Sequence, residues 1–508
     1  MMKTPKPKKA KASAELKNIL KSQGPMLSSQ VARNFESTGT KADAARQRTS
    51  RLPLDTAALK GISFPKGARF IYHKDDIGTY RYFEALRKTI RENSQPLTSA
   101  LNAINARDGV MSMQQFMISS GCPILQKKQL SAERVLAQLE STGLVRKHDI
   151  EGMGKIIVAG NTGLDQKLIK TMRARMMAEE FLLDAIASWL GRMNMVSPKV
   201  VEIRGDKNPR FSAFEFDLCG PSYLSPITNS KNGKKIPGFM VADVILGKEL
   251  SKDDVFPFLR KCTLLNNIRG RLPYLPMLIG DSFSVDALRG CRAMGIITTR
   301  PETLFGRDVA MSIGSLLEVL SSVALAPADR LQNIFRKLSS VEGAAGNLRG
   351  ALFEMITSHL VGELECGETH IGVLLIDSTN GKQAEADVVL KKQKKIIAYE
   401  CKGHQPKNKT GLTDVQHWLS NRIPIMHPGL IEKYGPSCTI KFEYWTCGIF
   451  DDEAILELEK ASREIKRYEI SWKDGESIIK YSKNLSATGV RKNLAEHFFK
   501  HPTAKLDL

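Results

Sequence analysis

Two apolar segments joined by a lysine-rich turn constrain the fold of this chain more than any other feature. Residues 386–390 are apolar apart from Asp387, and residues 396–402 start with four apolar residues and include Glu400 and Lys402. Such runs are typical of strands buried in a mixed sheet, so we expect a hairpin here. Strand periodicity places Glu400 and Lys402 on one face, and pairing brings Asp387 near Glu400 at the strand ends.

This arrangement of acids and a lysine predicts a particular chemistry. Two carboxylates held close together repel each other unless a hard divalent cation lies between them, and Mg²⁺ prefers carboxylate, water and phosphate oxygens. A lysine beside that cation can orient or deprotonate a water and stabilise charge on a phosphate. The alternative is that Glu400 and Lys402 are a solvated strand face, because Glu-x-Lys is a common short pattern. An acid at the end of a buried strand favours the site.

The order Asp387, spacer, Glu400-x-Lys402 resembles the PD-(D/E)XK nuclease superfamily, which has the restriction-endonuclease-like fold. The resemblance implies that Asp387 and Glu400 bind Mg²⁺, with Mn²⁺ as a substitute, and that Lys402 positions the attacking water. It also implies products with 5′-phosphate and 3′-hydroxyl ends. A helix expected over 347–361 is similar to the first core helix of that fold, so Glu354 is carried over as a further catalytic acid. A solvent-facing Glu354 is the open alternative.

The segments after Lys402 complete this domain, which we place at residues 335–508. The loop that leaves the second strand is polar and basic, and its Lys407 and Lys409 suit a phosphate backbone. A helix over 412–421, a strand over 441–450 and a helix over 451–464 are expected to follow.

Composition indicates a multidomain protein with an anionic partner. A chain of 508 residues is expected to hold about three or four domains. Its net charge of +21 predicts a nucleic acid, although a membrane surface or an acidic protein would also attract it. No stretch reaches the roughly 18 apolar residues of a spanning helix. The lysine-rich start is not a signal peptide, and the eight cysteines form no CxxC pair, so we expect a cytoplasmic protein with reduced thiols.

The N-terminal region contains a second signal. Residues 1–12 are expected to be a basic disordered tail, and residues 13–78 resemble a winged helix with helices over 14–23, 28–36 and 41–51 and a two-stranded wing over 61–72. In that fold the third helix enters the major groove of DNA. The residues placed against DNA are Lys41, Arg46, Arg48 and Arg51. A module that mediates only protein contacts is the alternative.

The same order of elements is expected again in residues 95–160. Helices over 97–107, 112–120 and 131–143 precede two strands within 144–158. The third of these helices carries both acids and bases, which makes a weaker phosphate surface than in the first copy. This second winged helix is therefore expected to pack on the rest of the protein.

Residues 165–310 look like a damaged copy of the nuclease domain. A helix over 167–192 precedes Glu215-x-Asp217, and Asp243-x-Ile245 follows where the acid-x-lysine pair would be. The lysine is missing. We expect this copy to bind, recognise or dimerise while the C-terminal copy cuts.

These features combine into one expected architecture and function. The fold is a multidomain α/β protein with an N-terminal α+β part: tandem winged helices, then a degenerate and an intact restriction-endonuclease-like αβ sandwich with a mixed sheet. The function is a magnesium-dependent DNA endonuclease in restriction or anti-phage defence, acting as a homodimer or with partner subunits and not in a membrane. The alternatives are a non-catalytic DNA-binding regulator and a transposon or recombination nuclease. No P-loop is present, so a translocase would be a separate chain.

Overall fold

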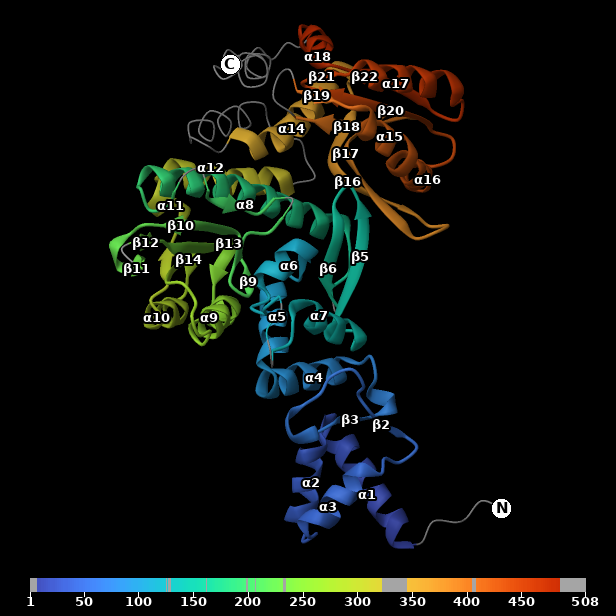
Figure 1. Cartoon of the computed structure of the whole chain (residues 1–508). Coiled ribbons are helices and arrows are strands. Elements are labelled where there is room, and N and C mark those ends of the chain that lie inside the picture. Colours follow the sequence, from blue (N-terminus) through green and yellow to red (C-terminus); the bar gives the residue numbers. More distant parts are fainter. Residues whose placement is uncertain are drawn as a thin grey trace.

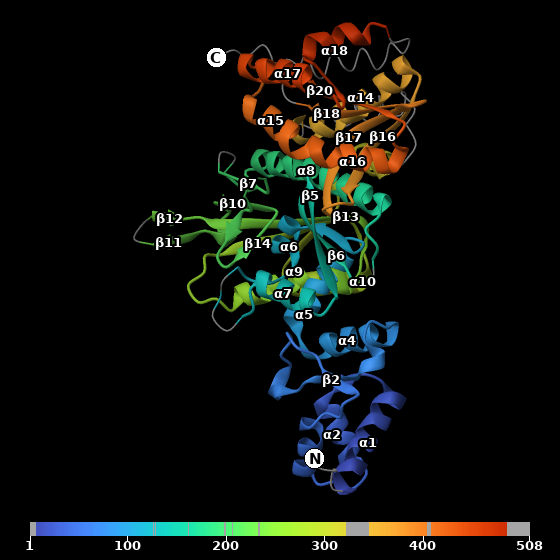
Figure 2. The same cartoon turned by 90° about the vertical axis from the view of Figure 1, so that its right-hand side faces the viewer.

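The computed structural model describes residues 7–484 apart from gaps at 125, 127–128, 161, 198–199, 206, 232–233, 322–344 and 404–407. The protein is a multidomain α/β molecule with mixed sheets. Four modules follow one another along the chain, and the first and last lie at opposite ends of the molecule in both views (Figures 1 and 2). Among the described residues no helix is long and apolar enough to cross a bilayer.

The first module contains three helices and a small antiparallel sheet. Its elements are α1 (Pro7–Gln23), β1 (Met26–Leu27), α2 (Ser28–Ser37), α3 (Ala42–Ser50), β2 (Thr56–Ala58) and β3 (Phe70–His73), with the strand order β1-β3-β2. The helix α1 begins at Pro7, inside the segment expected to be an unstructured tail, because proline is tolerated in a first turn and lysine and alanine propagate helices. The second strand pair begins at Thr56, earlier than expected, because Pro65 to Gly67 forms a 3₁₀ turn within a longer loop.

The second module repeats this order after a linking helix, α4 (Tyr80–Asn93), which the sequence did not predict. The side chain of Thr79 caps α4 by accepting a hydrogen bond from the backbone N–H of Tyr82. The module then consists of α5 (Gln95–Asn105), β4 (Val110–Ser112), α6 (Met113–Ser119), α7 (Ala132–Ser141), β5 (Val145–Glu151) and β6 (Gly154–Ala159). Strand β6 lies between β4 and β5, as β3 lies between β1 and β2.

The third module is a five-stranded sheet with helices on its faces. Its principal elements are α8 (Gln166–Arg192), β7 (Glu202–Ile203), β10 (Leu218–Ser222), β13 (Gly238–Leu250), α9 (Lys252–Asn266), β14 (Tyr274–Phe283), α10 (Val285–Ala293), β15 (Ile297–Thr299), α11 (Pro301–Phe305) and α12 (Arg307–Ser321). The strand order is β15-β14-β13-β10-β7.

The C-terminal module contains the hairpin expected from the sequence. Its principal elements are α14 (Ala345–Glu365), β16 (Glu368–Asp377), β17 (Lys382–Lys392), β18 (Lys395–Lys402), α15 (Leu412–His417), a π turn (Trp418–Arg422), α16 (Ile423–Tyr434), β20 (Thr439–Thr446), α17 (Asp452–Glu464), β22 (Glu469–Lys473) and α18 (Gly475–Ser482). The expected hairpin is confirmed: β17 and β18 pair antiparallel across a two-residue turn in which Gln393 has φ 54°.

The sheets of the last two modules share one topology. In the third module β7, β10 and β13 are antiparallel, and β14 and β15 continue parallel to β13. In the C-terminal module β16, β17 and β18 are antiparallel, and β20 and β22 continue parallel to β18. A long helix precedes each sheet, α8 in one case and α14 in the other. The structure therefore contains an internal repeat of five strands in the same order.

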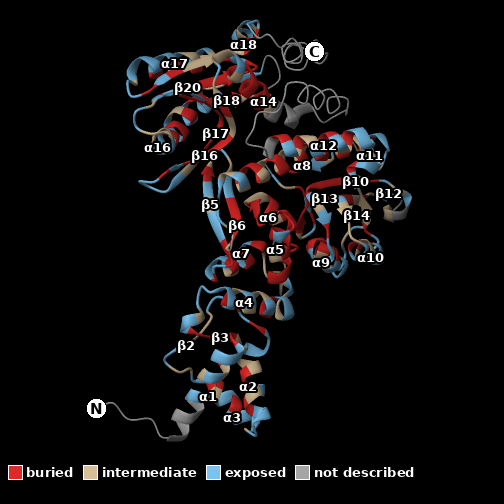
Figure 3. Ribbon diagram, turned by 180° about the vertical axis from the view of Figure 1, so that it is seen from behind, coloured by how far each residue is buried: buried red, intermediate tan, exposed pale blue. Residues whose placement is uncertain are grey.

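The modules are joined through their helices and through one strand pair. Residues of α8, α12 and α14 form a single hydrophobic core with β13 and β18, and Figure 3 shows α14 largely buried. Strand β5 of the second module pairs in parallel with β17 at Ile150 and Gln383, so the hairpin of β5 and β6, called the wing hairpin below, extends the C-terminal sheet. Both contacts bring other modules to the strand ends that carry the predicted acids.

Candidate active site

Asp387 and Glu400 lie side by side, as the hairpin predicts. Val388 pairs with Tyr399, so Asp387 and Glu400 follow at the next position of the register. The backbone N–H of Cys401 donates a hydrogen bond to Asp387 Oδ2 at 2.8 Å. Both carboxylates are buried. The backbone contact fixes Oδ2 of Asp387, and the other oxygen, Oδ1, faces Arg422 at 3.4 Å.

Lys402 lies on the same strand face as Glu400 and reaches the surface. Its Nζ is 2.9 Å from Glu400 Oε1, and one third (33 %) of its side chain is exposed. Burial lowers the pKa of Lys402, but the negative charges of Glu400 and Asp387 outweigh this and raise it above its ordinary value. The lysine therefore stays an ammonium group at neutral pH and connects a buried acid cluster with solvent.

Glu354 points into the same cluster from helix α14. It is buried, so the alternative of a solvent-facing acid is wrong. One oxygen pairs with Arg173, and the other, Oε2, is buried without a hydrogen-bond partner. Burial raises the pKa of Glu354 well above its ordinary value, and the nearby carboxylates of Asp387 and Glu385 add to this. The residue is thus a desolvated carboxyl group with an unused acceptor.

Two arginines that sequence reasoning missed neutralise these acids. Arg173 comes from α8 of the third module and pairs with Glu354 and, at 2.8 Å, with Glu385. Arg422 comes from the π turn; it pairs with Glu400, lies 3.4 Å from Asp387 Oδ1 and donates to the backbone carbonyl of Glu385 at 2.6 Å. No sequence motif marks either arginine. The site therefore includes Glu385 and draws one cation from a different module.

The position of Arg422 depends on an irregular helix and on the second module. Pro424 has no N–H for a regular helical bond, and the π turn ends just before it at Arg422. On the other side lies the turn of the wing hairpin: Gly152 has φ +90°, and a Cβ there would be 3.0 Å from Arg422 Nη2. Glu151, the last residue of β5 before this turn, pairs with His417 at 2.9 Å. The wing thus packs directly against the candidate site.

The charges of the cluster fit a hard divalent cation. Four carboxylates face three cationic side chains, which leaves one formal negative charge: Glu354, Glu385, Asp387 and Glu400 against Arg173, Arg422 and Lys402. Burial raises the pKa of Glu400, and the negative charge of Asp387 raises it further. Among the described residues no three His, Cys, Asp or Glu side chains form a ready metal cluster, and Arg422 contacts both Glu400 and Asp387. The carboxylate oxygens of Asp387 and Glu400, with the unpaired Oε2 of Glu354, nevertheless suit Mg²⁺, which prefers oxygen ligands.

The third module contains a counterpart of this cluster. The backbone N–H of Val244 donates to Asp217 Oδ2 at 2.8 Å, as Cys401 does to Asp387. Asp243 pairs with Lys261 of helix α9 at 2.6 Å. The lysine that is absent from position 245 is therefore replaced by Lys261 of the following helix. Sequence reasoning missed this lysine because it did not predict α9.

The counterpart is closed to solvent. Arg204 pairs with Asp217 at 2.8 Å and with Glu179 of α8 at 2.9 Å. The side chain of Lys261 is 0 % exposed and its Nζ lies 4.1 Å from the Phe216 ring. Unlike Lys402, this lysine does not reach solvent. The cluster of the third module is thus a set of satisfied internal ion pairs.

The predicted DNA-binding residues differ in what their side chains do. Lys41, Arg46 and Arg51 are exposed on or next to α3. Arg48 instead turns toward the fold: its Nη1 donates to Thr40 Oγ1 at 3.1 Å and its guanidinium lies over the Phe35 ring at 5.4 Å. In the C-terminal module Lys409 is exposed, and Lys407 lies outside the described residues.

Comparison with known proteins adds little to this geometry. No family model matches the chain, and no curated protein matches it. One solved structure, described as a protein of unknown function, AF1548, covers 27 % of this chain and 71 % of its own length at 16 % identity, with a TM-score of 0.20. A TM-score this low does not establish a common fold.

Proposed function

We propose that this protein is a magnesium-dependent DNA endonuclease of the PD-(D/E)XK kind. One observation carries the proposal: Asp387 is anchored by a backbone hydrogen bond beside Glu400, and Lys402 extends from the same strand face to solvent. Two adjacent acids and an accessible ammonium group are the side chains that phosphodiester hydrolysis with a metal requires. The order of the sheet strands, three antiparallel and two parallel after a long helix, supports the resemblance.

Each residue of the cluster has a role in this proposal. Asp387 and Glu400 would bind Mg²⁺ through their carboxylates, and Glu354 would assist a second ion through its unpaired oxygen. Bound Mg²⁺ supplies charge neutralisation at the phosphate and a more acidic water. Because the pKa of Lys402 is raised, its ammonium group would hold the attacking water and a phosphate oxygen by donating hydrogen bonds. Arg173 and Arg422 are positioning residues that keep the acids in place.

The N-terminal modules support a nucleic-acid substrate. Both have three helices and a sheet with the third strand in the middle, which is compatible with winged helices. The first presents Lys41, Arg46 and Arg51 to solvent at its third helix, and the chain carries a net charge of +21. Basic residues at such a helix suit the major groove and its phosphates. Restriction or anti-phage defence is the proposed setting, with a transposon or recombination nuclease as the alternative.

A non-catalytic role is favoured for the third module. Its acids are paired with Arg204 and Lys261, and none of these groups reaches solvent. Only one solvent-accessible set of catalytic side chains is present among the described residues. Double-strand cleavage would therefore need two copies of the chain, which makes a homodimer part of the proposal.

The test is cleavage of supercoiled plasmid DNA by the purified full-length protein. Cleavage should occur with Mg²⁺ or Mn²⁺ and stop in a chelator. Lys402→Ala and the nearly isosteric Asp387→Asn should abolish it, whereas Lys394→Ala, which removes an exposed lysine from the other end of the same hairpin, should not. Normal nicking by Lys402→Ala would refute the assignment, and a parallel reaction with RNA decides the substrate class.

A further inference from the structure

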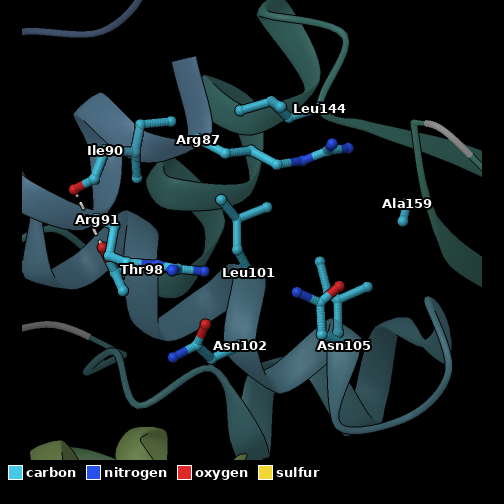
Figure 4. Close-up of a pocket in the computed structure, with 10 residues that line it drawn as sticks. Arg87, Ile90, Arg91, Thr98, Leu101, Asn102, Asn105, Leu144 and Ala159 are labelled. Atoms are coloured by element: carbon cyan, nitrogen blue, oxygen red, sulfur yellow. Dashed lines mark hydrogen bonds between the residues drawn. The ribbon is translucent and has the colours of Figure 1, made fainter. Parts of the chain in front are cut away.

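A polar pocket lies far from the candidate site, where the linking helix α4 meets the second module. Its volume is about 200 Å³. It is lined by residues of α4, α5 and the ends of the wing strands, shown in Figure 4: Arg87, Ile90, Arg91, Thr98, Leu101, Asn102, Ile104, Asn105, Leu144 and Ala159. None of these residues takes part in the proposed hydrolysis.

The two charged residues of this pocket are both arginines, and both lack partners. Arg87 and Arg91 are one helical turn apart on α4, and their side chains extend in the same direction on either side of Leu101 (Figure 4). Within the part of the chain that the structure describes, neither guanidinium has an ion pair or hydrogen bond, and no acid lines the pocket.

Asn102 adds a neutral amide to the two arginines of this pocket. It is only 7 % exposed, yet its amide has no hydrogen-bond partner among the described residues. The other buried polar group of the pocket, the Thr98 hydroxyl, is satisfied by the Ile90 carbonyl at 3.1 Å. The polar atoms of this amide remain accessible from the pocket, so they can donate to and accept from a polar ligand there.

Size and charge together select the class of ligand. A volume of 200 Å³ equals roughly seven waters, and it lies below the range of about 300–1,000 Å³ for pockets that enclose drug-sized ligands. Two guanidinium groups without a counter-acid match a dianion. A phosphate monoester carries a charge of about −1.5 to −2 at neutral pH, and arginine recognises it through paired N–H donors. A backbone phosphodiester carries only one charge.

We propose that this pocket binds a phosphate monoester through Arg87, Arg91 and the Asn102 amide, most naturally the phosphorylated end of a nucleic-acid strand. The location favours a strand end because α4 is fastened to the first module: Arg81 donates to the carbonyls of Lys21 and Ser22 at 3.0 and 3.1 Å. A nucleic-acid strand bound at the basic helix α3 would lie on the module to which α4, and with it this pocket, is attached. The inference does not depend on cleavage by the C-terminal module.

The test is calorimetric titration of the full-length protein without divalent metal, so that no hydrolysis contributes. The probes are inorganic phosphate, a mononucleotide and its nucleoside, and one oligonucleotide with either a 5′-phosphate or a 5′-hydroxyl. The mononucleotide should bind at least tenfold more tightly than the nucleoside. A tenfold gain from the 5′-phosphate on the oligonucleotide assigns the ligand to a strand end, and a gain seen only with the mononucleotide assigns it to a small phosphorylated ligand.

Variants make the test specific to the pocket. Arg87→Gln and Arg91→Gln should each remove the phosphate-dependent gain, and Asn102→Leu should reduce it. Lys88→Gln removes one charge from the same helix at an exposed position outside the pocket and should leave the gain unchanged. The proposal is overturned if phosphate groups add no affinity, or if Lys88→Gln weakens binding as much as Arg87→Gln. Lys402→Ala should bind normally, which separates this result from the fate of the proposed nuclease activity.

Discussion

Arg173, on helix α8 of the third module, forms an ion pair at 2.8 Å with Glu385 on strand β17 of the C-terminal module. The same guanidinium pairs with Glu354, and only 15 % of the arginine side chain is exposed. A buried charge is stable only when it is compensated, so these acids depend on a cation from the neighbouring module. The third module is therefore a structural part of the candidate active site, whatever its own cluster does.

Substitution of Arg173 should destabilise the C-terminal module. Arg173→Ala leaves two buried acids without their main cation, and loss of one partner of a buried pair costs about 3–5 kcal/mol. Thermal unfolding of the full-length protein should show an earlier transition. Lys167→Ala, at an exposed position of the same helix, is the control. Adding Glu354→Gln and Glu385→Gln to Arg173→Ala should restore part of the stability, and an unchanged transition in the single variant would contradict the role given to Arg173.

Arg173 also shows why the sequence predicted only part of this site. Asp387, Glu400 and Lys402 belong to one hairpin, and local register alone brings them together. Arg173 is 181 residues away from Glu354, and its contact depends on how α8 packs against α14. Alternation of apolar and polar residues predicts that strands exist but not which strands pair.

Two further features were missed for the same kind of reason. The pairing of β5 with β17 rests on two residue pairs and has no sequence pattern of its own. Lys261 was missed because a lysine was sought next to Asp243 on the strand, whereas the structure supplies it from the following helix. Different helices or strands can bring a charged group to the same position in the fold. A sequence motif describes only one such arrangement.

The closed cluster of the third module should be dispensable for cleavage. Asp243→Asn keeps the shape of the side chain but leaves the buried Lys261 without its counter-charge, so the variant should lose stability, whereas plasmid cleavage per folded molecule should stay close to the wild-type rate. Lys261→Ala should instead unfold this module, because it leaves Asp243 unpaired at a cost of about 3–5 kcal/mol. Circular dichroism reports the folded fraction for both. A folded Asp243→Asn protein that no longer cuts would show that this module has a catalytic site of its own.

Arg422 should compete with Mg²⁺ for the acids of the candidate site. Its guanidinium pairs with Glu400 and lies 3.4 Å from Asp387, so Arg422→Gln frees two carboxylates for a cation. The variant should be less stable than wild type in a chelator and gain more from added Mg²⁺. A ligand at about one hundred times its Kd stabilises the native state by about 2.7 kcal/mol. Thermal melting over a Mg²⁺ series measures this, with the exposed Arg463→Gln as control. An equal Mg²⁺ effect in both proteins would contradict competition.

Asp184 should make the protein less stable as pH rises. Burial raises the pKa of Asp184 from 3.8 to about 6, and Glu180 one turn earlier adds to this. The folded state therefore keeps a proton that the unfolded state releases, and stability falls as pH increases between 3.8 and about 6. Asp184→Asn escapes this loss. After allowance for solvent screening, its free energy of unfolding should exceed that of wild type by roughly 1–2 kcal/mol at pH 8. Below pH 4 the two proteins should be equally stable. Denaturant unfolding at both pH values checks this, and equal stabilities at pH 8 would refute it.

In the first module, removal of an exposed arginine should weaken DNA binding, whereas removal of the packed Arg48 should lower stability. Arg46 and Arg51 are exposed next to the candidate groove helix, whereas Arg48 packs over Phe35 and donates to Thr40. Arg46→Ala and Arg51→Ala should therefore leave stability unchanged but weaken DNA binding, by about 1–3 kcal/mol for each hydrogen-bonded base that the arginine no longer reaches. Arg48→Ala should mainly lower the melting temperature, since it removes packing and a hydrogen bond from the fold.

Binding over a panel of duplexes at two salt concentrations separates the possible uses of this module. If Arg46 contacts a base, its removal flattens the preference among sequences. If it contacts only phosphate, affinity falls equally for all duplexes and the salt dependence becomes shallower, because fewer counterions are released. If the wild type has no sequence preference, or Arg46→Ala changes neither affinity nor salt dependence, α3 does not read DNA. The basic surface would then serve another partner, and any specificity of cleavage would have to come from the remaining modules.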